Sequence, residues 1–528
     1  IAIQYAVTRP QRAEAAGRRR TQQNRKEPAV QFGDYEGLTY LGKLKPQKST
    51  QIAGSRLGVG FECLDRDAWN PEQAWPVLDN LGVKWARVQT GWARTEKQRG
   101  VYDFAWLDAI VDKLLERGVQ PWLSLSYGNP AYTEQMNTAP RGQEPVYESC
   151  PAAGVGFPPI HSEAERTGWQ NYVRALVRHF RNRVTHYEVW NEPDLLGFWK
   201  CQPKAAEYVD LVRLTATPVR ELQPDAKLIG GALAWGMTAW SIKYLEDCFA
   251  AGLHELLDIS TYHGYKSIPE RHSTQEIDAF RNLIRKHKPQ LVYWQGEAGM
   301  VSHVPEASRG QSALSTMPCS EAIQARMLLR RALLELHNGC GMTSYFHMAD
   351  FAKYGGQGST FHYGLVRLED GSPKPSYFAL QTLCTLLHDP MVPANGASAC
   401  HMSVLRDTHD PRATRTFTWH ANFLRGDVPV HAWWLPEAVE DDPIYLHAEM
   451  NYWLEKGLRL NEPVLIEPVS QEVYAAPTHW DKRTCGETWM TPDPQAQGLR
   501  VFRPVPVSNS PLLLTDRSII EVQADRSS

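Results

Sequence analysis

The sequence predicts an α/β fold in which a (β/α)8 TIM barrel carries a β-sandwich accessory domain formed by both termini. Three observations lead to this prediction. Strand-like and helix-like segments alternate from Leu57 to about Met391. Beyond Met391, short strand-like segments follow one another without helices, separated by Pro, Asp and Gly. The strand-like residues before Gln51 have no partner in a barrel, so we expect them to pair with the C-terminal strands.

These changes of pattern set the expected domain boundaries. Residues 1–53 and 392–528 would form the sandwich, and residues 54–391 the barrel. The first segment opens with Ile1–Val7, which reads as a strand. The run Arg18–Arg20 is compatible with a nucleic-acid patch, but its isolation favours a solvated loop or a short helix.

Eight segments rich in β-branched and aromatic residues are the expected barrel strands. They are Leu57–Cys63, Lys84–Gln89, Gln120–Ser126, His186–Trp190, Lys227–Gly231, Asp258–Tyr262, Leu291–Gln295 and Gly341–Met348. Intervening segments with apolar residues at helical spacing include Phe104–Arg117, Trp169–Phe180, Ala322–Leu336 and Pro375–Leu387. The expected sandwich strands include Thr414–His420, Val430–Leu435, Val464–Glu467 and Leu512–Thr515. Eight strand–helix units are the number that closes a barrel, and the Gly-rich first turn of a doubly wound sheet is missing.

Composition narrows the functional classes. The formal net charge of −3 gives no general argument for binding nucleic acid or a membrane surface. No apolar run reaches the roughly 18 residues of a membrane-spanning helix. The nine cysteines lack the spacing of a metal site, and Cys150 and Cys201 could be bridged or free. We therefore expect no cofactor and no metal. Ile1–Thr8 is not an intact signal peptide, and a secreted or periplasmic location after removal of a leader is favoured over a cytoplasmic one.

The first candidate catalytic group is Glu192, in the segment Thr185–Asp194, T-H-Y-E-V-W-N-E-P-D. The segment begins as a strand and stops at Asn191 and Pro193, residues that favour turns and end a ladder of hydrogen bonds. Glu192 is therefore expected at the C-terminal end of a barrel strand, where catalytic groups stand in this fold. A solvated loop glutamate is the alternative.

A second carboxylate, Glu297, ends the apolar segment Leu291–Gln295 and lies between small residues, in G-E-A-G. Glu192 ends the fourth expected strand and Glu297 the seventh, 105 residues later (297 − 192), so both would project into the same mouth. Two carboxyl groups facing one bond are what glycoside hydrolysis needs, one to protonate the leaving oxygen and one to attack or to activate water.

On these residues the chain resembles the retaining glycoside hydrolases of clan A, and among them family 39, which includes β-xylosidases and α-L-iduronidases. The resemblance rests on E-V-W-N-E-P-D followed by Phe198-Trp199, and on D-I-S-T-Y-H-G-Y from Asp258, similar to the His-x-Tyr of the family's sixth strand. It covers roughly residues 57 to 390. Gln295-Gly296 departs from a common Thr, and Ser344–Asp350 lacks a Trp common in the clan. Family substrates have equatorial leaving groups on xylo, gluco, galacto, α-L-idurono or α-L-arabino sugars.

The resemblance implies a role for each matching residue. Glu192 would be the acid/base and Glu297 the nucleophile, with Arg87 beside it and Tyr265 hydrogen-bonded to it. Asn191 would bond the sugar 2-hydroxyl and His263 would line the sugar pocket. Further candidates for substrate contact stand at other strand ends: Glu62, Tyr127, Asn129, Trp199, Trp235, His347 and Asp350.

The implied partner is a glycoside, oligosaccharide or polysaccharide, with no nucleic acid and no membrane. Two rival functions stay open at this point. The barrel could bind carbohydrate without turnover, although both glutamates are present. It could instead act on a phosphorylated metabolite, for which Gly355–Gly358 is the one candidate phosphate loop, without a helix start after it.

Overall fold

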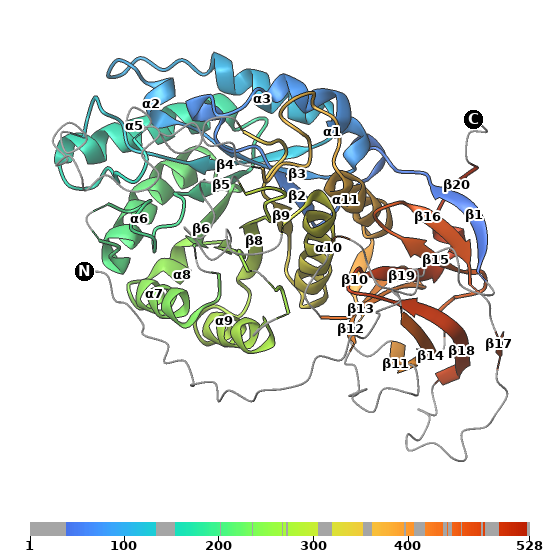
Figure 1. Ribbon diagram of the computed structural model, residues 1–528. Coiled ribbons are helices and arrows are strands. Elements are labelled where there is room, and N and C mark those ends of the chain that lie inside the picture. Colours follow the sequence, from blue (N-terminus) through green and yellow to red (C-terminus); the bar gives the residue numbers. More distant parts are fainter. Residues whose placement is uncertain are drawn as a thin grey trace, which may run out of the picture.

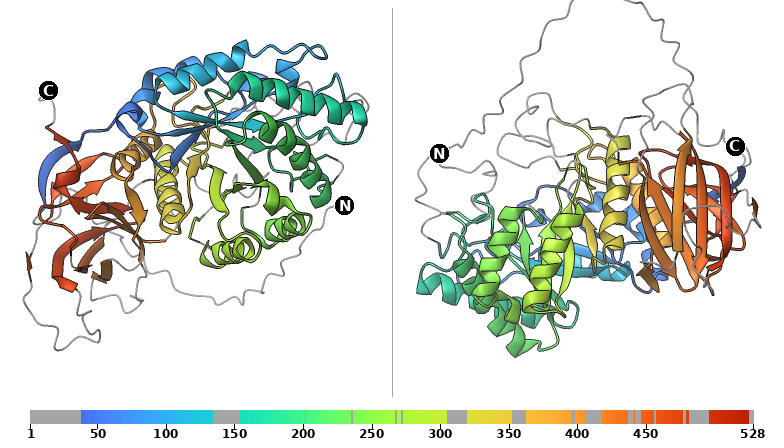
Figure 2. Two further views of the ribbon diagram at one scale, coloured as in Figure 1. Left: turned by 180° about the vertical axis from the view of Figure 1, so that it is seen from behind. Right: turned by 90° about the horizontal axis from the view of Figure 1, so that it is seen from below.

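The computed structural model describes residues 38–524 with several gaps. The gaps are 134–153, 201, 235, 267, 271–272, 305–318, 352–361, 395–397, 406–417, 437–440, 442–445, 456, 477–478 and 481–495. Several expectations lie outside the described residues: the strand Ile1–Val7, the arginine run, Trp235, the pair Cys150 and Cys201, and the loop Gly355–Gly358. Within the described residues, two bodies stand side by side, a helix-ringed barrel and a stack of sheets (Figures 1 and 2).

A closed barrel of eight parallel strands confirms the predicted fold class. Its strands are β2 (Leu57–Gly60), β3 (Trp85–Gln89), β4 (Gln120–Leu125), β5 (His186–Val189), β6 (Lys227–Leu233), β7 (Ile259–His263), β8 (Val292–Ala298) and β9 (Thr343–Tyr345). Each pairs with the next, and β9 closes the ring on β2, with Thr343 opposite Leu57. Each of the eight predicted strand segments overlaps one of these strands, and β6, β7 and β8 extend beyond the predicted ends.

Helices surround this barrel (Figure 1). The longer ones are α1 (Trp75–Leu81), α3 (Ala105–Glu116), α5 (Glu163–Phe180), α6 (Ala205–Leu222), α7 (Ala239–Ala250), α9 (Ser273–His287), α10 (Glu321–His337) and α11 (Pro375–Leu386). Short helical turns are α2 (Trp92–Thr95), α8 (Leu253–Leu256), η2 (Ser49–Gln51), η3 (Leu64–Arg66), η4 (Pro71–Gln73) and η8 (Arg517–Ile519). Helix α5 begins earlier than its apolar pattern predicted, because Ser162 and Glu165 form a capping box that satisfies its first amides.

The second body is a β-sandwich whose larger sheet has eight strands. In spatial order they are β10 (Met391–Pro393), β12 (Trp419–Arg425), β13 (Val428–Trp434), β19 (Leu512–Asp516), β15 (Pro463–Glu467), β16 (Glu472–Ala475), β1 (Thr39–Leu44) and β20 (Val522–Gln523). The smaller sheet is β11 (Ser398–Leu405), β14 (Leu446–Glu455), β18 (Ala496–Val507) and β17 (His479–Trp480). Trp433, Met450 and Leu512 belong to one buried cluster that draws on both sheets.

Strand β1 lies between β16 and β20 and pairs antiparallel with both. Strand β1 precedes the barrel in the sequence, whereas the other strands of this sheet all follow it. The sandwich is therefore built from both ends of the described chain. Helices α10 and α11 stand between barrel and sandwich in Figures 1 and 2. There the buried Glu270 binds Arg330 of α10 through both oxygens and also accepts a hydrogen bond from the indole of Trp434.

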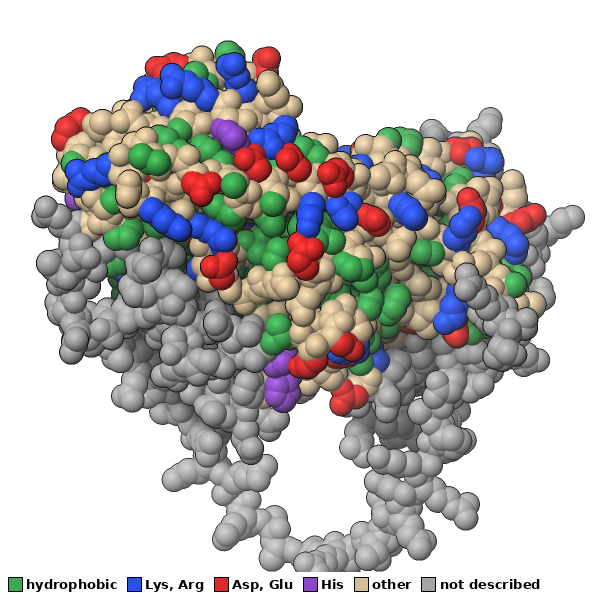
Figure 3. All heavy atoms as spheres, turned by 90° about the horizontal axis from the view of Figure 1, so that it is seen from above, with side chains coloured by type: hydrophobic (Ala, Val, Ile, Leu, Met, Phe, Trp, Pro, Cys, Tyr) green, Lys and Arg blue, Asp and Glu red, His purple; other side chains and the backbone are tan. Residues whose placement is uncertain are grey.

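The outer face over α3 and α5 carries charges of both signs (Figure 3). Arg183 of the loop after α5 reaches Asp108 and Asp112 of α3, each at 2.6 Å. Among the described residues, no helix combines the length and the apolar character needed to span a bilayer.

Candidate active site

The strand end at β5 places Glu192 in an uncommon backbone conformation. Trp190 and Glu192 have φ angles of 70° and 49°, in the left-handed region that side chains with a Cβ rarely adopt. The Glu192 amide donates to the Ala232 carbonyl at 3.1 Å, which fastens the turn to the end of β6. Such strain persists where surrounding contacts over-determine it, and it is concentrated at functional sites.

Glu297 of β8 meets Glu192 across the C-terminal end of the barrel. One carboxylate oxygen of each, together with a ring nitrogen of His263, lie within 4.8 Å of one another. Both glutamates are nearly buried, with 7% and 9% of their surface exposed. Glu192 and Glu297 therefore come together at the C-terminal opening of the barrel.

Hydrogen-bond donors surround Glu297. The Arg87 guanidinium donates to its Oε2 at 2.5 Å, and the Tyr265 hydroxyl donates to its Oε1 at 2.7 Å. Burial and the neighbouring Glu297 raise the pKa of Tyr265 well above its usual value, so its hydroxyl keeps its proton at neutral pH. Both carboxylate oxygens thus act as acceptors, and the side chain is held in a fixed orientation.

Arg87 organises this part of the site. Its Nε donates to Glu188 at 2.6 Å, and its second terminal nitrogen donates to Asn191 Oδ1 at 3.0 Å. The Nη1 group that holds Glu297 also lies 3.4 Å from Glu62 Oε1. Burial by itself would lower the pKa of this guanidinium, but the three carboxylates raise it, so Arg87 is a permanent cation.

Glu188 is a residue of this network that the sequence analysis missed. It is fully buried on β5, bonded to Arg87 and, at 2.8 Å, to the Thr261 hydroxyl. The sequence could have revealed it, because Glu188 lies inside an apolar strand segment. A carboxylate is almost never buried in such a segment without a cationic partner.

Glu192 has the opposite surroundings. Burial raises its pKa to about 8, the nearby Asp194 adds to the rise, and Arg87 opposes it. His263 Nδ1 lies 2.8 Å from Glu192 Oε1. Burial lowers the pKa of His263, so the imidazole is neutral near pH 7. The two glutamates therefore differ in their contacts, since Glu297 accepts from a cation and a hydroxyl and Glu192 lies against an imidazole.

The contacts of the His263 ring indicate which of its nitrogens carries the proton. Its Nε2 is buried without a hydrogen-bond partner in the described structure. A buried N–H group without an acceptor is destabilised more than a buried ring nitrogen whose lone pair has no donor. We therefore assign the ring proton to Nδ1, which donates to Glu192 Oε1 and leaves Nε2 unprotonated. The acidic proton of Glu192 is then left on Oε2. The sequence analysis expected His263 to line the sugar pocket, and the structure gives it this contact with the acid.

A sequence profile of glycosyl hydrolases family 39 matches residues 75–426. The chain belongs to this family. It aligns at 25% identity over 314 residues with a beta-xylosidase of Geobacillus stearothermophilus, covering 56% of this chain and 58% of the relative. With a beta-xylosidase of Caldicellulosiruptor saccharolyticus, identity is 24% over 349 residues, covering 60% and 65%. The alignments thus span less than two thirds of each relative.

Solved structures share the fold of this family 39 chain. A family 39 glycoside hydrolase from Bacteroides cellulosilyticus WH2 superimposes with a TM-score of 0.57 at 18% identity, covering 88% of this chain and 81% of that one. A GH39 beta-xylosidase from Caulobacter crescentus gives 0.53 at 19% identity, covering 90% and 97%. Both matches extend over barrel and sandwich sequence alike.

Two further predicted residues lie behind the family 39 glutamates. Glu62 follows β2 and is 1% exposed, and His347 follows β9 and is fully buried. Burial and the nearby Glu297 raise the pKa of Glu62 to about 8, against the influence of Arg87. Burial lowers the pKa of His347 to about 4. Their facing atoms, Glu62 Oε2 and His347 Nε2, are 3.7 Å apart.

Four other predicted contacts are occupied by the protein itself. The Tyr127 hydroxyl accepts from Gln89 at 3.0 Å, and its ring packs against Trp190. Trp199 is fully buried, also against Trp190. Neither ring offers a face to a substrate in this structure.

Asn129 and Asp350 are likewise held by local contacts. Asn129 bonds the Glu96 carbonyl and the Ala131 amide, each at 2.8 Å. Asp350 accepts from Lys374 at 2.8 Å and from the Gly364 amide at 2.7 Å. The structure does not bring either side chain to the two glutamates.

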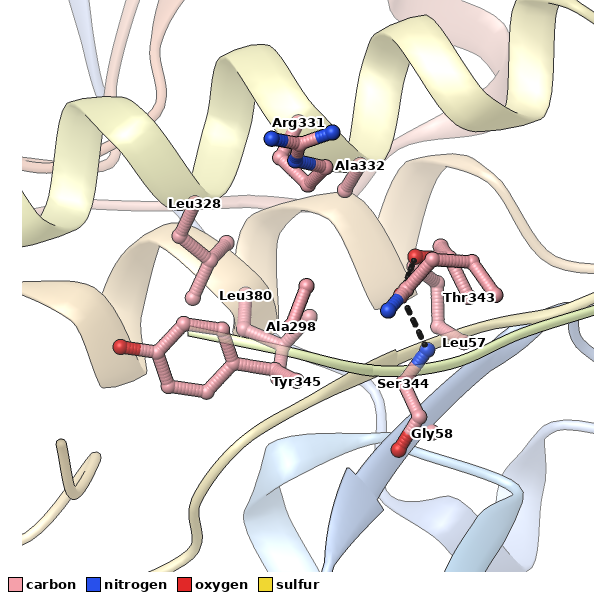
Figure 4. A pocket seen from close by; sticks show the side chains of 11 residues that line it. Leu57, Gly58, Ala298, Leu328, Arg331, Ala332, Thr343, Ser344, Tyr345 and Leu380 are labelled. Carbon is pink, nitrogen blue, oxygen red and sulfur yellow. Dashed lines mark hydrogen bonds between the residues drawn. The ribbon is translucent and has the colours of Figure 1, made fainter. Parts of the chain in front are cut away.

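A small crevice between the barrel wall and helices α10 and α11 is shown in Figure 4. Its polar centre is Gln295, whose Oε1 accepts from the Thr343 hydroxyl at 2.7 Å and from the Ser344 amide at 3.2 Å. Leu328 and Arg331 of α10 line the opposite side. The crevice lies outside the barrel strands, so it is separate from the opening that contains Glu192 and Glu297.

Proposed function

We propose that this chain hydrolyses glycosidic bonds with retention of anomeric configuration. The observation that carries the proposal is the pair of carboxylate oxygens of Glu192 and Glu297 within 4.8 Å of each other. Retaining enzymes have carboxyl groups about 5–5.5 Å apart, whereas inverting enzymes need roughly 6.5–9.5 Å to leave room for a water molecule. The approach of one oxygen from each side chain to within 4.8 Å supports the retaining arrangement.

The two steps follow from the surroundings of each carboxylate. Glu297 attacks the anomeric carbon while Glu192 gives its proton to the departing oxygen, forming a glycosyl ester and releasing the alcohol. Glu192, now a carboxylate, then takes a proton from water, which displaces Glu297 from the anomeric carbon. Arg87 and Tyr265 hold the attacking oxygens, and Asn191, itself held by Arg87, is placed for the sugar 2-hydroxyl.

The substrate class is a glycoside with an equatorial leaving group, β-D or α-L. Two relatives aligned over more than half of this chain are named beta-xylosidases, so β-D-xylosides are the first substrates to test. A panel of nitrophenyl glycosides would rank them against gluco, galacto and α-L-arabino analogues. The presence of both glutamates in one opening supports turnover over binding alone.

The stereochemistry of the product tests the mechanism. We expect proton NMR during hydrolysis of the best nitrophenyl glycoside to show first the anomer with the configuration of the substrate. The other anomer should grow in only with mutarotation. If the inverted anomer forms first, double displacement is refuted whatever the substrate is.

We also expect the pH profile of kcat/KM to fall on its alkaline side near pH 8. The first step needs a protonated Glu192, whose folded-state pKa is about 8, so the rate drops about tenfold per pH unit above it. The alkaline limb should vanish in Glu192→Ala with a dinitrophenyl leaving group that needs no proton. Glu62 is the matched control, because its pKa is also raised to about 8. A limb that shifts in Glu62→Gln but survives in Glu192→Ala would contradict the assignment.

A further inference from the structure

The loops after β5 and β6 form one wall beside Glu192, because hydrogen bonds join Glu192 to Ala232 and Asp194 to Ala234. In the proposed function, on which this inference rests, Glu192 protonates the leaving oxygen, so the leaving group lies on its side of the opening. Asp194, two residues later, joins this loop to the one after β6. Its Oδ1 accepts from the Ala234 amide at 2.8 Å and its Oδ2 accepts from the Ser241 hydroxyl at 2.7 Å.

This wall exposes two large apolar side chains. Leu196, in the loop after β5, and Trp240, at the start of α7, are each 60% exposed. The Trp240 indole Nε1 donates to the Asp194 carbonyl at 3.4 Å, so the ring is attached to the loop that carries Glu192. Seven large apolar residues in the described part of the chain are between 37% and 61% exposed, and Trp240 is the one tryptophan among them.

Exposure of these two residues has no structural benefit, because apolar surface left in water forgoes about 25 cal/mol per Å² of burial. Single exposed apolar residues are ordinary, but here two come from neighbouring loops that Asp194 holds together. An indole offers a flat face on which the apolar side of a sugar ring or an aryl group can stack.

We propose that Trp240 and Leu196 form a binding surface for the leaving group, either the next sugar of an oligosaccharide or an aryl aglycone. Asp194 links the loop that carries Leu196 to the start of α7, which carries Trp240, so both residues lie on the side of Glu192 rather than of Glu297. The surface would therefore strengthen binding of extended substrates and contribute nothing to substrates that lack a leaving-group ring.

A series of substrates with one glycone tests this. The glycone is the sugar that the wild type hydrolyses best, presented as the glycosyl fluoride, the nitrophenyl glycoside and the disaccharide. In Trp240→Ala we expect kcat/KM to fall roughly fivefold to tenfold for the nitrophenyl glycoside and the disaccharide. The glycosyl fluoride, which has no ring to stack, should keep its wild-type value. Leu196→Ser should show the same pattern with a smaller loss.

Phe378→Ala is the matched control, since Phe378 is an exposed aromatic residue of α11, 37% accessible, and should change none of the three substrates. Equal losses on all three substrates in Trp240→Ala, or no loss on any, would overturn the leaving-group surface and leave the proposed function standing. A wild type that hydrolyses none of the glycosides would overturn both. A wild-type dimer that Trp240→Ala converts to monomer would show a protein interface there and also refute the surface.

Discussion

Replacing Glu297 by alanine should lower turnover of every glycoside by on the order of 10⁴-fold or more, because no other group can form the glycosyl ester. Arg87 and Tyr265 would lose the acceptor that they now hold at 2.5 and 2.7 Å. The variant should fold, since Arg87 keeps its bond to Glu188. Steady-state kinetics with a nitrophenyl and a dinitrophenyl glycoside would measure the loss, and a good leaving group should not repair it.

Added azide gives the Glu297→Ala variant a distinct signature. The space left by the carboxylate lets azide attack an activated substrate directly, so the glycosyl azide should have the inverted configuration. A suitable control is Glu165→Ala, which removes another buried glutamate, the capping residue of α5. Its loss should cost about 1 kcal/mol of stability but leave kcat unchanged. Azide of retained configuration from Glu297→Ala would show that Glu297 is not the nucleophile.

Replacing Glu192 by alanine should have the second-largest effect, with a leaving-group dependence that Glu297→Ala lacks. Natural glycosides need protonation of the departing oxygen, and general acid catalysis contributes roughly 10²- to 10⁴-fold. A dinitrophenyl glycoside needs none, so it should still form the glycosyl ester on Glu297. The second step then lacks its base, and the ester should accumulate as a burst of dinitrophenol and as a mass increase of one glycosyl unit.

Azide should release this ester, because an anionic nucleophile needs no general base. The product should be a glycosyl azide of retained configuration, with kcat rising as azide is added. Glu62→Gln serves as the control, since it removes a neighbouring carboxyl group of similar pKa without touching the acid. It should show neither an accumulated ester nor rescue by azide. A retained azide from Glu297→Ala together with an inverted one from Glu192→Ala would mean that the two roles are exchanged.

Periodic patterns and turn residues in the sequence were enough to predict the barrel and its two glutamates. The spacing of apolar residues, every second residue in strands and every 3.6 residues in helices, is a local property of the sequence. Eight successive strand–helix units of this kind form a closed (β/α)8 barrel. Asn191 and Pro193 end β5 at a definite residue, which places Glu192 at the mouth without reference to any other strand. The pairing of β1 with β16 and β20 agrees with the expectation that a strand without a barrel partner seeks the sandwich.

The tertiary structure decided that the Glu297 side chain points into the barrel. Strict alternation along β8 would put Gln295 and Glu297 on the same side of the sheet. The register of β8 shifts between Gln295 and Ala298 against β9, and also against β7. As a result, Gln295 points outward under α10, while Glu297 turns inward to Arg87. An irregularity of this kind depends on the neighbouring strands, which the local pattern does not contain.

The roles of Glu188, Glu62 and His263 were likewise decided by contacts between distant parts of the chain. Arg87 on β3 meets carboxylates from three other strand ends, and His263 on β7 meets the acid that follows β5. Sequence determined which residues stand at the strand ends, because strand ends are local. Only closure of the barrel decided which of them touch. It set which carboxyl group accepts from Arg87 and Tyr265 and which lies against His263, because charge proximity is a property of the folded chain.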